Sequence, residues 1–394
     1  CGAVVAALVC DVLMELCTNE ERDAVLGDAK SVTQRYLVNL AMATVCDVCP
    51  LVDVNRIIVK LGLKAAKDTE NLGLQALIRE CGLAGSEITT YHLGFVLGPC
   101  FNATGRLDVA DRAFELLGAN DEDEAASLAR ACKDLNEERK SMTAVWLDKA
   151  VEICERDGLA NDHVLVVFLD GCHESLAGII AGRLRERYSR PSIVLTRADD
   201  GVKGSGRSIE AYNMFEEISK ASSLLTKFGG HPMAAGLSLP EENIEPFRKL
   251  LNEEEKLSDA DLTEKLLIDA IVPFGLMDER VIGELSRLEP FGTGMSRPVF
   301  AEKDLKVLKI EEIGRVKKFL KFRLLNAGNR VIDAVYFGDS AELLSRLESR
   351  FGSESVKTAF RGKESDVTMT VAYQPEINEY QGIRSIRMKI SDVL

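Results

Sequence analysis

The chain has 394 residues and a formal net charge of −14, with 46% hydrophobic and 28% charged residues. This composition is typical of a folded protein of about two to three domains, and it excludes collagen-like and wholly disordered chains. The longest apolar runs fall far short of the roughly 18 residues of a membrane-spanning helix, and no basic segment of a secretory signal precedes the apolar start. The acidic balance argues against a protein that coats DNA through its overall field, although a local basic groove is compatible with it.

Ten cysteines are scattered through apolar patterns rather than arranged in a spaced framework. This usage is typical of a reducing compartment, so we expect a cytoplasmic protein. A Cys-x-x-Cys pair, Cys46 and Cys49, has no second such pair and no nearby histidine pair. Buried structural thiols are therefore the simpler interpretation, with a zinc site as the alternative.

The first part of the chain, 1–120, shows helical periodicity with breaks near 27–28, at 50 and at 82–85. Its opening apolar pattern has no initiator methionine and no cap, which suggests a helix cut from a larger domain. We interpret 1–120 as the helical half of a domain whose sheet is missing. The next segment lacks glycine and proline from 121 to 157 and begins with acidic residues, so 121–160 is predicted to contain one long connecting helix.

Alternating strands and helices then predict an α/β domain over 161–258. Strands are expected at 163–170, 192–196, 202–208 and 233–239, and helices at 175–188, 211–227 and 241–258. From 265 to 394 the expected strands are short and alternating, at 266–272, 305–311, 319–325, 331–337, 366–374 and 385–390, with a helix at 340–350. This pattern favours a small β-barrel, with an OB-fold as the natural choice.

Two glycine-containing segments of the α/β domain suit an anion. Gly229-Gly230-His231 is expected between a helix and a strand, where backbone amides can approach a ligand and the imidazole adds a donor. Upstream, Ser205, Arg207 and Ser208 combine two hydroxyls and a guanidinium before a helix, which indicates a phosphate cradle. Arg207 stands where a P-loop requires lysine, and the glycines do not fit a dinucleotide fingerprint, so neither of those folds is expected.

Four further features have open alternatives. His173 at a strand-to-helix turn either faces a ligand or caps the helix. Asn102 and Arg106 lie in what we predict to be a glycine-bounded loop, suited to a phosphodiester backbone or simply an interhelix turn. Asp47, where a helix must end, can bind a hard cation, but one carboxylate cannot hold two.

The fourth feature is a run at 315–323 that interleaves basic and aromatic residues, with lysines at Lys317, Lys318 and Lys321. Such a run can follow a nucleic-acid backbone by charge and stack bases on its rings. A solvated strand with its aromatic side chains turned inward is nearly as good an interpretation.

Together these segments resemble the RecJ single-strand-specific exonucleases of the DHH phosphoesterase superfamily. Segment 44–51 is similar to the last aspartate motif of the DHH domain, and 98–107 to the loop that follows it. Segments 172–184, 204–208 and 229–236 are similar to the DHH-associated domain, and 288–294, 298–300 and 373–382 to the RecJ OB domain. The expected fold is therefore multidomain α/β plus β: a helical remainder of a DHH domain, a connecting helix, an α/β DHH-associated domain and a C-terminal OB-fold barrel.

The resemblance implies roles for these residues. The intact family removes nucleotides from the 5′ end of single-stranded DNA in repair and recombination, using two Mn²⁺ or Mg²⁺ ions. Asp47 would be a metal ligand, Asn102 and Arg106 would hold the scissile backbone with His173 beside them, and the other residues would bind phosphate and strand: Ser205, Arg207, Ser208, Gly229, Gly230, His231, Lys317, Lys318 and Lys321. The implied partners are single-stranded DNA with a 5′ phosphate, a single-strand-binding protein and a helicase, and no membrane.

The chain also departs from the family pattern. His173 lies between Cys172 and Glu174, whereas the family usually has Trp before it and Pro or Gly after it. The early aspartates and the Asp-His-His motif are absent, so the chain is similar to the C-terminal two-thirds of a RecJ protein and is expected to be a truncated form. Two alternatives remain: a catalytically dead fragment that binds single-stranded DNA, or a DHH phosphodiesterase acting on short oligonucleotides, against which the barrel counts.

Overall fold

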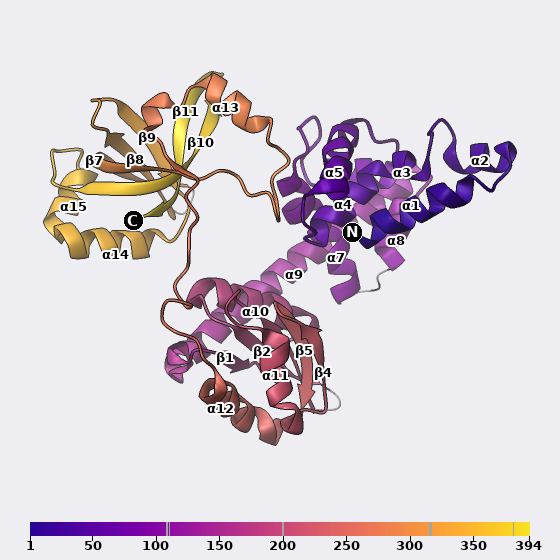
Figure 1. The fold of residues 1–394 in the computed structure, drawn as a ribbon, viewed down its shortest axis with the longest axis horizontal. Helices are drawn as coiled ribbons and strands as arrows, with labels where there is room; N and C mark the ends of the chain where they lie inside the picture. Colours follow the sequence, from indigo (N-terminus) through magenta and orange to yellow (C-terminus); the bar gives the residue numbers. More distant parts are fainter. Residues whose placement is uncertain (108, 110, 199–200, 315–316, 381) are drawn as a thin grey trace. The chain divides into compact units, whose positions relative to one another are not determined.

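The computed structural model of the protein describes residues 1–394 except 108, 110, 199–200, 315–316 and 381. It divides into two compact units (Figure 1). The first unit joins Cys1–Gly62 to Leu266–Leu394, and the second is Leu63–Lys265. No helix of the described residues is long and apolar enough to cross a membrane.

The helical part of the first unit packs five helices around a small core. They are α1 (Gly2–Met14), α2 (Asn19–Leu26), α3 (Val32–Arg35), α4 (Leu37–Cys46) and α5 (Asp53–Ala65). The core is formed by Val4, Ala7, Leu26, Val32, Leu40 and Ile58. On α1, Val5, Val9 and Val12 are each more than half exposed, at 60%, 53% and 63%. These residues form an exposed apolar face, and no strand occurs between residues 1 and 120 in the described part of the chain, so this region is helical as predicted.

The C-terminal part of the first unit is a closed barrel, which confirms the OB-like prediction. Its strands are β7 (Phe300–Ile313), β8 (Phe319–Leu325), β9 (Val331–Tyr336), β10 (Thr368–Tyr380) and β11 (Ile383–Val393), with β6 (Ala270–Ile271) added beside β7. The order is β10-β11-β9-β8-β7-β6, and pairing of β10 with β7 closes the barrel. Its helices are α13 (Glu279–Ser286), α14 (Ser340–Phe351) and α15 (Ser353–Phe360). The strand expected at 266–272 is reduced to the two residues of β6, and α15 was not predicted.

A loop after α13 joins the barrel to the helices of the same unit. Arg56 on α5 donates from Nη1 to the carbonyl of Pro290 at 2.9 Å and from Nη2 to that of Leu288 at 2.5 Å. The amide of Leu51 donates to the carbonyl of Thr293 at 2.7 Å. One guanidinium therefore satisfies carbonyls of a loop more than 230 residues away in the chain.

The second unit begins with α6 (Leu72–Glu80), α7 (Gly98–Leu107), α8 (Asp111–Gly118) and α9 (Glu122–Arg156), with a π-helix at His92–Leu97. α9 is the predicted long helix. Its N-cap Asp121 accepts hydrogen bonds from the amides of Asp123 and Glu124, which satisfies donors that the helix itself leaves unpaired. The prediction of a loop around Asn102 and Arg106 is wrong, because both residues lie on α7, four positions apart and thus on one helix face.

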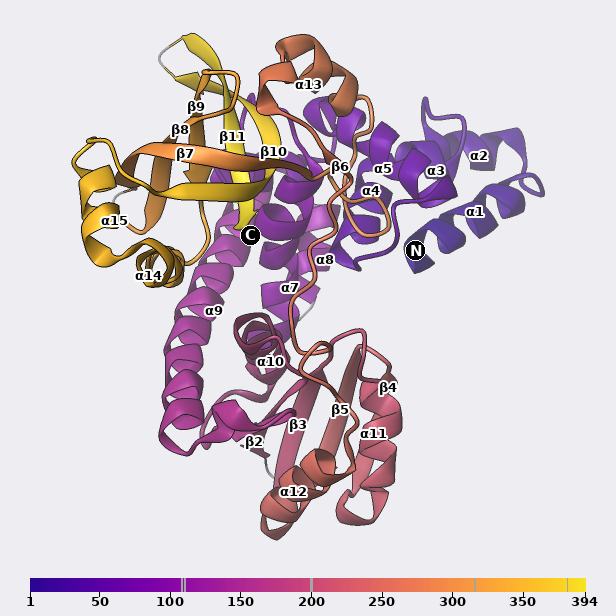
Figure 2. The same cartoon turned by 60° about the vertical axis from the view of Figure 1, so that its left-hand side comes forward.

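The sheet of the second unit has the order β1-β2-β3-β5-β4, in which β1 and β2 are parallel and the other pairs antiparallel (Figure 2). The strands are β1 (Leu165–Phe168), β2 (Ser192–Ala198), β3 (Gly201–Arg207), β4 (Lys227–His231) and β5 (Ala234–Leu239). α9 and α10 (Glu174–Tyr188) cover one face, and α11 (Met214–Lys220) and α12 (Ile244–Glu254) cover the other. This architecture confirms the α/β prediction.

The helix predicted over 211–227 is wrong in extent. α11 ends at Lys220, and the chain continues into β4, which pairs with β5 in the register Gly229↔Gly236. A local helical pattern therefore gives way to strand pairing, because β5 offers β4 a complete set of backbone partners. Gly229-Gly230-His231 consequently lies within an edge strand rather than in a turn after a helix.

Packing between α6 and α8 depends on Gly73. A Cβ at Gly73 would lie 1.8 Å from the carbonyl oxygen of Leu116, whereas a Cβ at Gly118, the last residue of α8, would meet nothing within 4 Å. We expect Gly73→Ala to lower the free energy of unfolding by about 1–3 kcal/mol. Gly118→Ala should change it by less than about 1 kcal/mol. Urea unfolding followed by circular dichroism measures both, and equal effects would contradict this account of the packing.

Candidate functional site

The start of α10 is the centre of the candidate site. Its N-cap is His173, whose Nδ1 accepts from the amide of Ser175 at 3.3 Å and lies 2.7 Å from Oγ of the same serine. His173 is also exposed, so the capping alternative is realised at Nδ1 while the rest of the ring faces solvent. A helix N-terminus concentrates unpaired amide donors and the positive end of the helix dipole, which favours anions.

Two arginines from different elements lie at this helix start. Arg106 on α7 donates from Nη1 to the carbonyl of Ser175 at 2.7 Å. Arg207, the last residue of β3, donates from Nη1 to Oγ of Ser205 at 3.0 Å. The structure thus brings together Arg106, Ser205 and Arg207, three of the residues singled out in the sequence, although about 100 residues separate the two arginines.

Like charges gather around these arginines. Burial lowers the pKa of Arg106 and of Arg207, and for Arg207 the charges of Arg106 and Arg185 lower it further. Arg139 on α9 is half-buried in the same way, and burial followed by the charge of Arg106 lowers its pKa. No ion pair links Arg106, Arg139 or Arg207 to a carboxylate within the described ranges. All three guanidiniums remain charged, so the group is a strong site for an anion.

Gly178 on α10 makes the room that Ser205 and Arg207 occupy. A Cβ at this position would lie 2.6 Å from Nη2 of Arg207 and 2.9 Å from Oγ of Ser205. Any larger residue would therefore displace the guanidinium. Sequence reasoning did not assign Gly178 to the site, because the contact is with residues almost thirty positions further along the chain.

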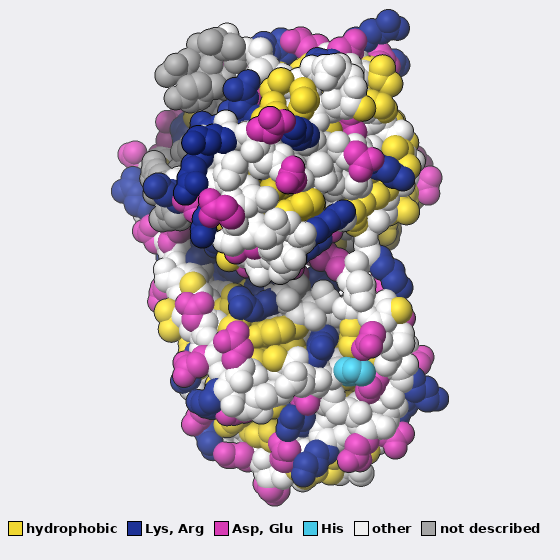
Figure 3. All heavy atoms as spheres, turned by 90° about the vertical axis from the view of Figure 1, so that its left-hand side faces the viewer, with side chains coloured by type: hydrophobic (Ala, Val, Ile, Leu, Met, Phe, Trp, Pro, Cys, Tyr) yellow, Lys and Arg dark blue, Asp and Glu magenta, His cyan; other side chains and the backbone are white. Residues whose placement is uncertain are grey.

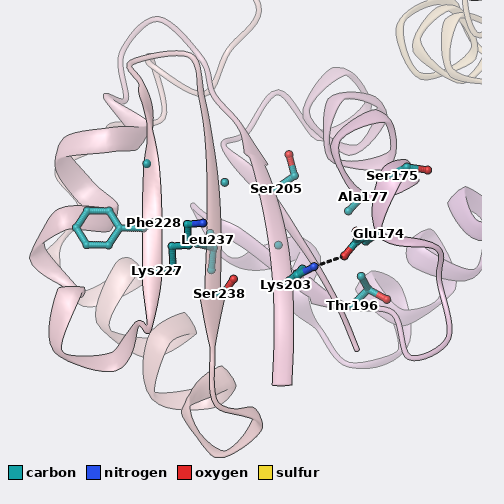
Figure 4. A pocket seen from close by; sticks show the side chains of 13 residues that line it. Glu174, Ser175, Ala177, Thr196, Lys203, Ser205, Lys227, Phe228, Leu237 and Ser238 are labelled. Carbon is teal, nitrogen blue, oxygen red and sulfur yellow. Dashed lines mark hydrogen bonds and ion pairs between the residues drawn. The ribbon is translucent and has the colours of Figure 1, made fainter. Parts of the chain in front are cut away.

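A cavity of about 480 Å³ opens beside α10 on the part of the sheet face that this helix does not cover (Figure 4). Its floor includes the cross-strand row Ser205–Gly236–Gly229 of β3, β5 and β4. A Cβ at Gly236 or Gly229 would meet nothing within 4 Å. The bare backbone of these two glycines therefore lets a ligand lie against the sheet.

Charged side chains border the cavity. Lys203 and Lys227 line it together with Glu174, and Lys203 Nζ lies 2.7 Å from Oε2 of Glu174. Gly236, Lys203 and Lys227 were not among the residues predicted for the site. The alternation of β3 and β4 offered a signal for the two lysines, since residues two apart on a strand share a face: Lys203 lies two before Ser205, and Lys227 two before Gly229.

The remaining predicted residues of this domain lie around the cavity rather than in its lining. Ser208 is fully buried and its hydroxyl donates to the carbonyl of Tyr212 at 2.5 Å, a contact that stabilises the turn after β3. A Cβ at Gly230 would lie 2.4 Å from the carbonyl oxygen of Ala234, so this glycine is required by the β4–β5 hairpin. His231 is exposed at the end of β4.

Asp47 lies in the first unit, as the residue that ends α4. It is exposed, and its carboxylate lies within 4.8 Å of the thiols of Cys1 and Cys49. Mg²⁺ and Mn²⁺ prefer oxygen ligands, whereas this group offers one carboxylate and two sulfurs. The described residues around Asp47 therefore do not fit a centre for two hard cations.

The barrel lysines lie on and before β8. Lys317 and Lys318 are exposed ahead of the strand, and residues 315–316 of the same run lie outside the described residues. Lys321 faces outward, with Nζ 3.7 Å from a carboxylate oxygen of Asp333. Phe322 points into the barrel core. For this residue the structure agrees with the alternative interpretation, a solvated strand whose aromatic side chains turn inward.

Phe319 is the aromatic residue of this run that remains partly accessible. It is partly buried and meets Phe337 edge to face, with ring centroids 5.2 Å apart. Figure 3 shows Lys and Arg side chains mixed with acidic ones over the face that it draws. A broad basic field is therefore not a feature of that face.

Two family models match the chain. The RecJ OB domain matches residues 268–392, and the DHHA1 domain matches residues 161–256. Among curated proteins, the single-stranded-DNA-specific exonuclease RecJ of Bacillus subtilis (strain 168) is 37% identical over 304 residues, which cover 75% of this chain and 38% of the relative.

Solved structures of RecJ are also similar to this chain. RecJ of Thermus thermophilus in complex with Mg²⁺ has a TM-score of 0.73 at 25% identity, over 91% of this chain and 52% of that one. The same protein in complex with Mn²⁺ has a TM-score of 0.74 at 24% identity, over 91% of this chain and 49% of that one. The chain thus spans between 38% and 52% of the lengths of these relatives.

The arginine group should cost stability while no anion is bound. We expect Arg207→Met, which keeps the apolar stem and removes the charge, to leave the free energy of unfolding unchanged or to raise it by up to about 1 kcal/mol. Arg248→Met is the matched control, because Arg248 Nε lies 2.6 Å from Asp162. This control should lose about 1–3 kcal/mol. Urea unfolding at low salt without phosphate measures both, and a comparable loss in the two variants would show that Arg207 has a structural role.

Proposed function

We propose that this chain binds the 5′-phosphorylated end of single-stranded DNA, as the binding step of 5′-to-3′ exonucleolytic hydrolysis. The chain belongs to the RecJ exonuclease family and carries a DHHA1 domain and a RecJ OB domain. The observation that carries the proposal is the group of guanidiniums at the start of α10, which form no ion pair with a carboxylate among the described residues and lie beside an open cavity. A terminal phosphate carries more charge than an internal phosphodiester, so it is the group that such a site favours most.

Arg207 and Ser205 are proposed to grip this terminal phosphate. The guanidinium can turn its remaining N–H groups to two phosphate oxygens, and the Ser205 hydroxyl, which now accepts from Arg207, has its own proton to donate. Ser208 remains a proposed support of this grip through the turn that it stabilises. Arg106, held by the Ser175 carbonyl, would contact the next phosphate together with Asn102, which lies one helical turn earlier on α7.

The glycine floor is proposed to carry the first nucleotide. Gly229 and Gly236 leave open space above the sheet, while Gly230 holds the hairpin that places His231 at the rim. The ring nitrogen of His231 that does not accept from the Met233 amide would donate to a phosphate oxygen. His173 is proposed to act in the same way from the start of α10.

The barrel is proposed to hold the strand beyond the site. Lys317, Lys318 and Lys321 would follow the phosphates, and the accessible edge of Phe319 would stack with a base. For the whole protein we propose a role in DNA repair and recombination in the cytoplasm, with a single-strand-binding protein and a helicase as partners. Hydrolysis in the family is proposed to use Mn²⁺ or Mg²⁺, with Asp47 as one ligand, but the described residues do not complete that centre.

The terminal-phosphate role is tested by strand binding. We expect Arg207→Met to weaken binding of a 5′-phosphorylated single strand by about 10-fold or more and binding of the 5′-hydroxyl strand by less than about 3-fold. Fluorescence anisotropy with 3′-labelled strands, at one stated salt concentration, measures both affinities. Lys220→Met, which removes an exposed charge paired with Glu217, is the control. Equal losses on the two strands would refute the assignment of Arg207 to the 5′ phosphate.

The state of the hydrolytic centre is tested by cleavage. Because one carboxylate does not fit two hard cations, we expect this chain to bind 3′-labelled, 5′-phosphorylated single strands without shortening them in Mn²⁺. A parallel reaction with a chelator is the control. Metal-dependent shortening from the 5′ end would show that the residues of this chain suffice for catalysis. Selective cleavage of two- or three-nucleotide substrates would instead favour a phosphodiesterase of short oligonucleotides.

A further inference from the structure

Two thiols and one carboxylate gather at the C-terminal end of α4. The thiols belong to Cys1 and Cys49, and the carboxylate belongs to Asp47. The three ligand atoms all lie within 4.8 Å of one another, although Cys1 is far from the other two residues in the sequence. All three residues belong to the first compact unit. Asp47 is exposed and both cysteines are partly exposed, so a cation can reach the group from solvent.

The turn after α4 holds Asp47 and Cys49 close together. Its amides remain hydrogen-bonded to the helix, since Val48 donates to the carbonyl of Val45 and Cys49 to that of Thr44, both at 3.1 Å. Val48 adopts the left-handed conformation, with a φ of 54°, which is uncommon for a β-branched residue. The chain therefore reverses directly after the helix, and Cys49 returns beside Asp47 instead of leading away from it.

Asn55 ties Cys1 to the same turn. Its Oδ1 accepts from the backbone nitrogen of Cys1 at 3.2 Å, and its Nδ2 donates to the carbonyl of Pro50 at 3.1 Å. Cys1 also packs against the small helical core of this unit. The hydrogen bonds of Asn55 use backbone atoms of Cys1 and Pro50, so they position the Cys1 thiol without occupying it.

The spacing of the three ligand atoms fits a tetrahedral cation. Zinc bonds of about 2.3 Å to sulfur and about 2.1 Å to oxygen place neighbouring ligand atoms about 3.6–3.8 Å apart. Separations of at most 4.8 Å therefore close by about 1 Å, a movement that rotation of exposed side chains supplies. Three protein ligands leave a fourth position for water, as in zinc sites that keep an open position.

The chemistry of the donors selects among metals. Thiolates favour zinc and other thiophilic cations, whereas Mg²⁺ and Mn²⁺ prefer sets of oxygen ligands. Two of the three donors in this group are sulfur. The group therefore disfavours the hard cations that the resemblance implies at Asp47 and favours a different class of metal.

We propose that Cys1, Asp47 and Cys49 form a binding site for a thiophilic divalent cation, Zn²⁺ in particular. Each thiol gives up its proton when it coordinates the cation, so two protons per cation pass to solvent. Zn²⁺ at this site occupies the carboxylate that the proposed hydrolytic centre would use for Mn²⁺ or Mg²⁺. The proposal concerns metal binding alone and does not depend on the proposed binding of DNA.

Cobalt binding to the reduced full chain tests the site. Co²⁺ bound by thiolates absorbs in the near ultraviolet through charge transfer from sulfur to metal, whereas Co²⁺ bound only by oxygen does not. We expect one Co²⁺ per chain with this absorbance, lost on addition of one equivalent of Zn²⁺ and retained in an excess of Mg²⁺ of about 1,000-fold. Absence of the charge-transfer band at one equivalent of Co²⁺, or its loss in Mg²⁺, would overturn the proposal.

Four variants locate the site. At saturating Co²⁺, Cys1→Ser and Cys49→Ser should each lose about half of the charge-transfer absorbance, and each should bind Co²⁺ at least about 10-fold more weakly, since loss of an outer partner of a ligand already has an effect of this size. Asp47→Asn should weaken binding by a similar factor and keep the full band. Cys46→Ser is the matched control, because Cys46 is the other cysteine of the Cys-x-x-Cys pair and lies outside the group. Weaker binding by Cys46→Ser together with unchanged binding by Cys1→Ser would assign the metal to that pair and refute the proposal.

Protection of thiols gives a measurement on the wild-type chain. Trypsin releases Cys1 and Cys10 in peptide 1–22 and Cys49 in peptide 36–56. One equivalent of Zn²⁺ should slow alkylation of Cys1 and Cys49 by iodoacetamide about 10-fold or more, while Cys10, which is exposed on α1, reacts at its metal-free rate. Equal rates with and without Zn²⁺ at Cys1 and Cys49 would contradict the site. Neither measurement contains DNA, so failure of the metal site and failure of the proposed function are observed separately.

Discussion

The site depends on one electrostatic constraint: guanidiniums of like charge are held close together, partly buried and without a carboxylate partner among the described residues. Arg106 is tied to the carbonyl of Ser175 and Arg207 to the hydroxyl of Ser205, so neutral oxygens rather than carboxylates orient both. Neutral acceptors orient the two guanidiniums without cancelling their positive charge. An unbalanced positive potential therefore remains at the start of α10. The free chain bears an electrostatic cost that an anion would remove. Such a trade of stability against binding is common at functional sites.

The sheet of the second unit is arranged to keep this site open. α10 packs on β2 and β3, while β5 and β4 extend beyond it with small residues on the same face. β5 turns Ala235, Leu237 and Leu239 towards the core under α11 and α12. The alternate residue Gly236 then faces the cavity, so one strand serves the core on one side and the ligand on the other. On α10, Gly178 also provides space for the site, because the absence of a Cβ leaves room for the Arg207 guanidinium.

The long helix α9 connects several parts of the second unit. Its first half packs on α6 and α7 and carries Cys132 and Asn136, and its last turns pack under β1 with Cys154. Because it has neither glycine nor proline, the relative positions of side chains along it are set by helix geometry alone. Asn136 therefore orients Arg139 through a single turn of α9 rather than through a flexible loop.

Periodicity by itself determined the order of elements in this protein: the helical start, the long helix over Glu122–Arg156, the α/β domain and the barrel were all predicted, because each depends on patterns within ten to thirty residues. The residue types of the anion site could also be predicted, since a guanidinium and hydroxyls close together in the sequence are typical of a phosphate site. Tertiary structure alone decided which of them meet. Arg106 reaches Ser175 across 69 residues, Gly178 is a site residue only because Arg207 lies against it, and Lys220 ends α11 because β5 supplies partners for β4. Contacts between distant segments follow from packing and strand pairing, which no local pattern encodes.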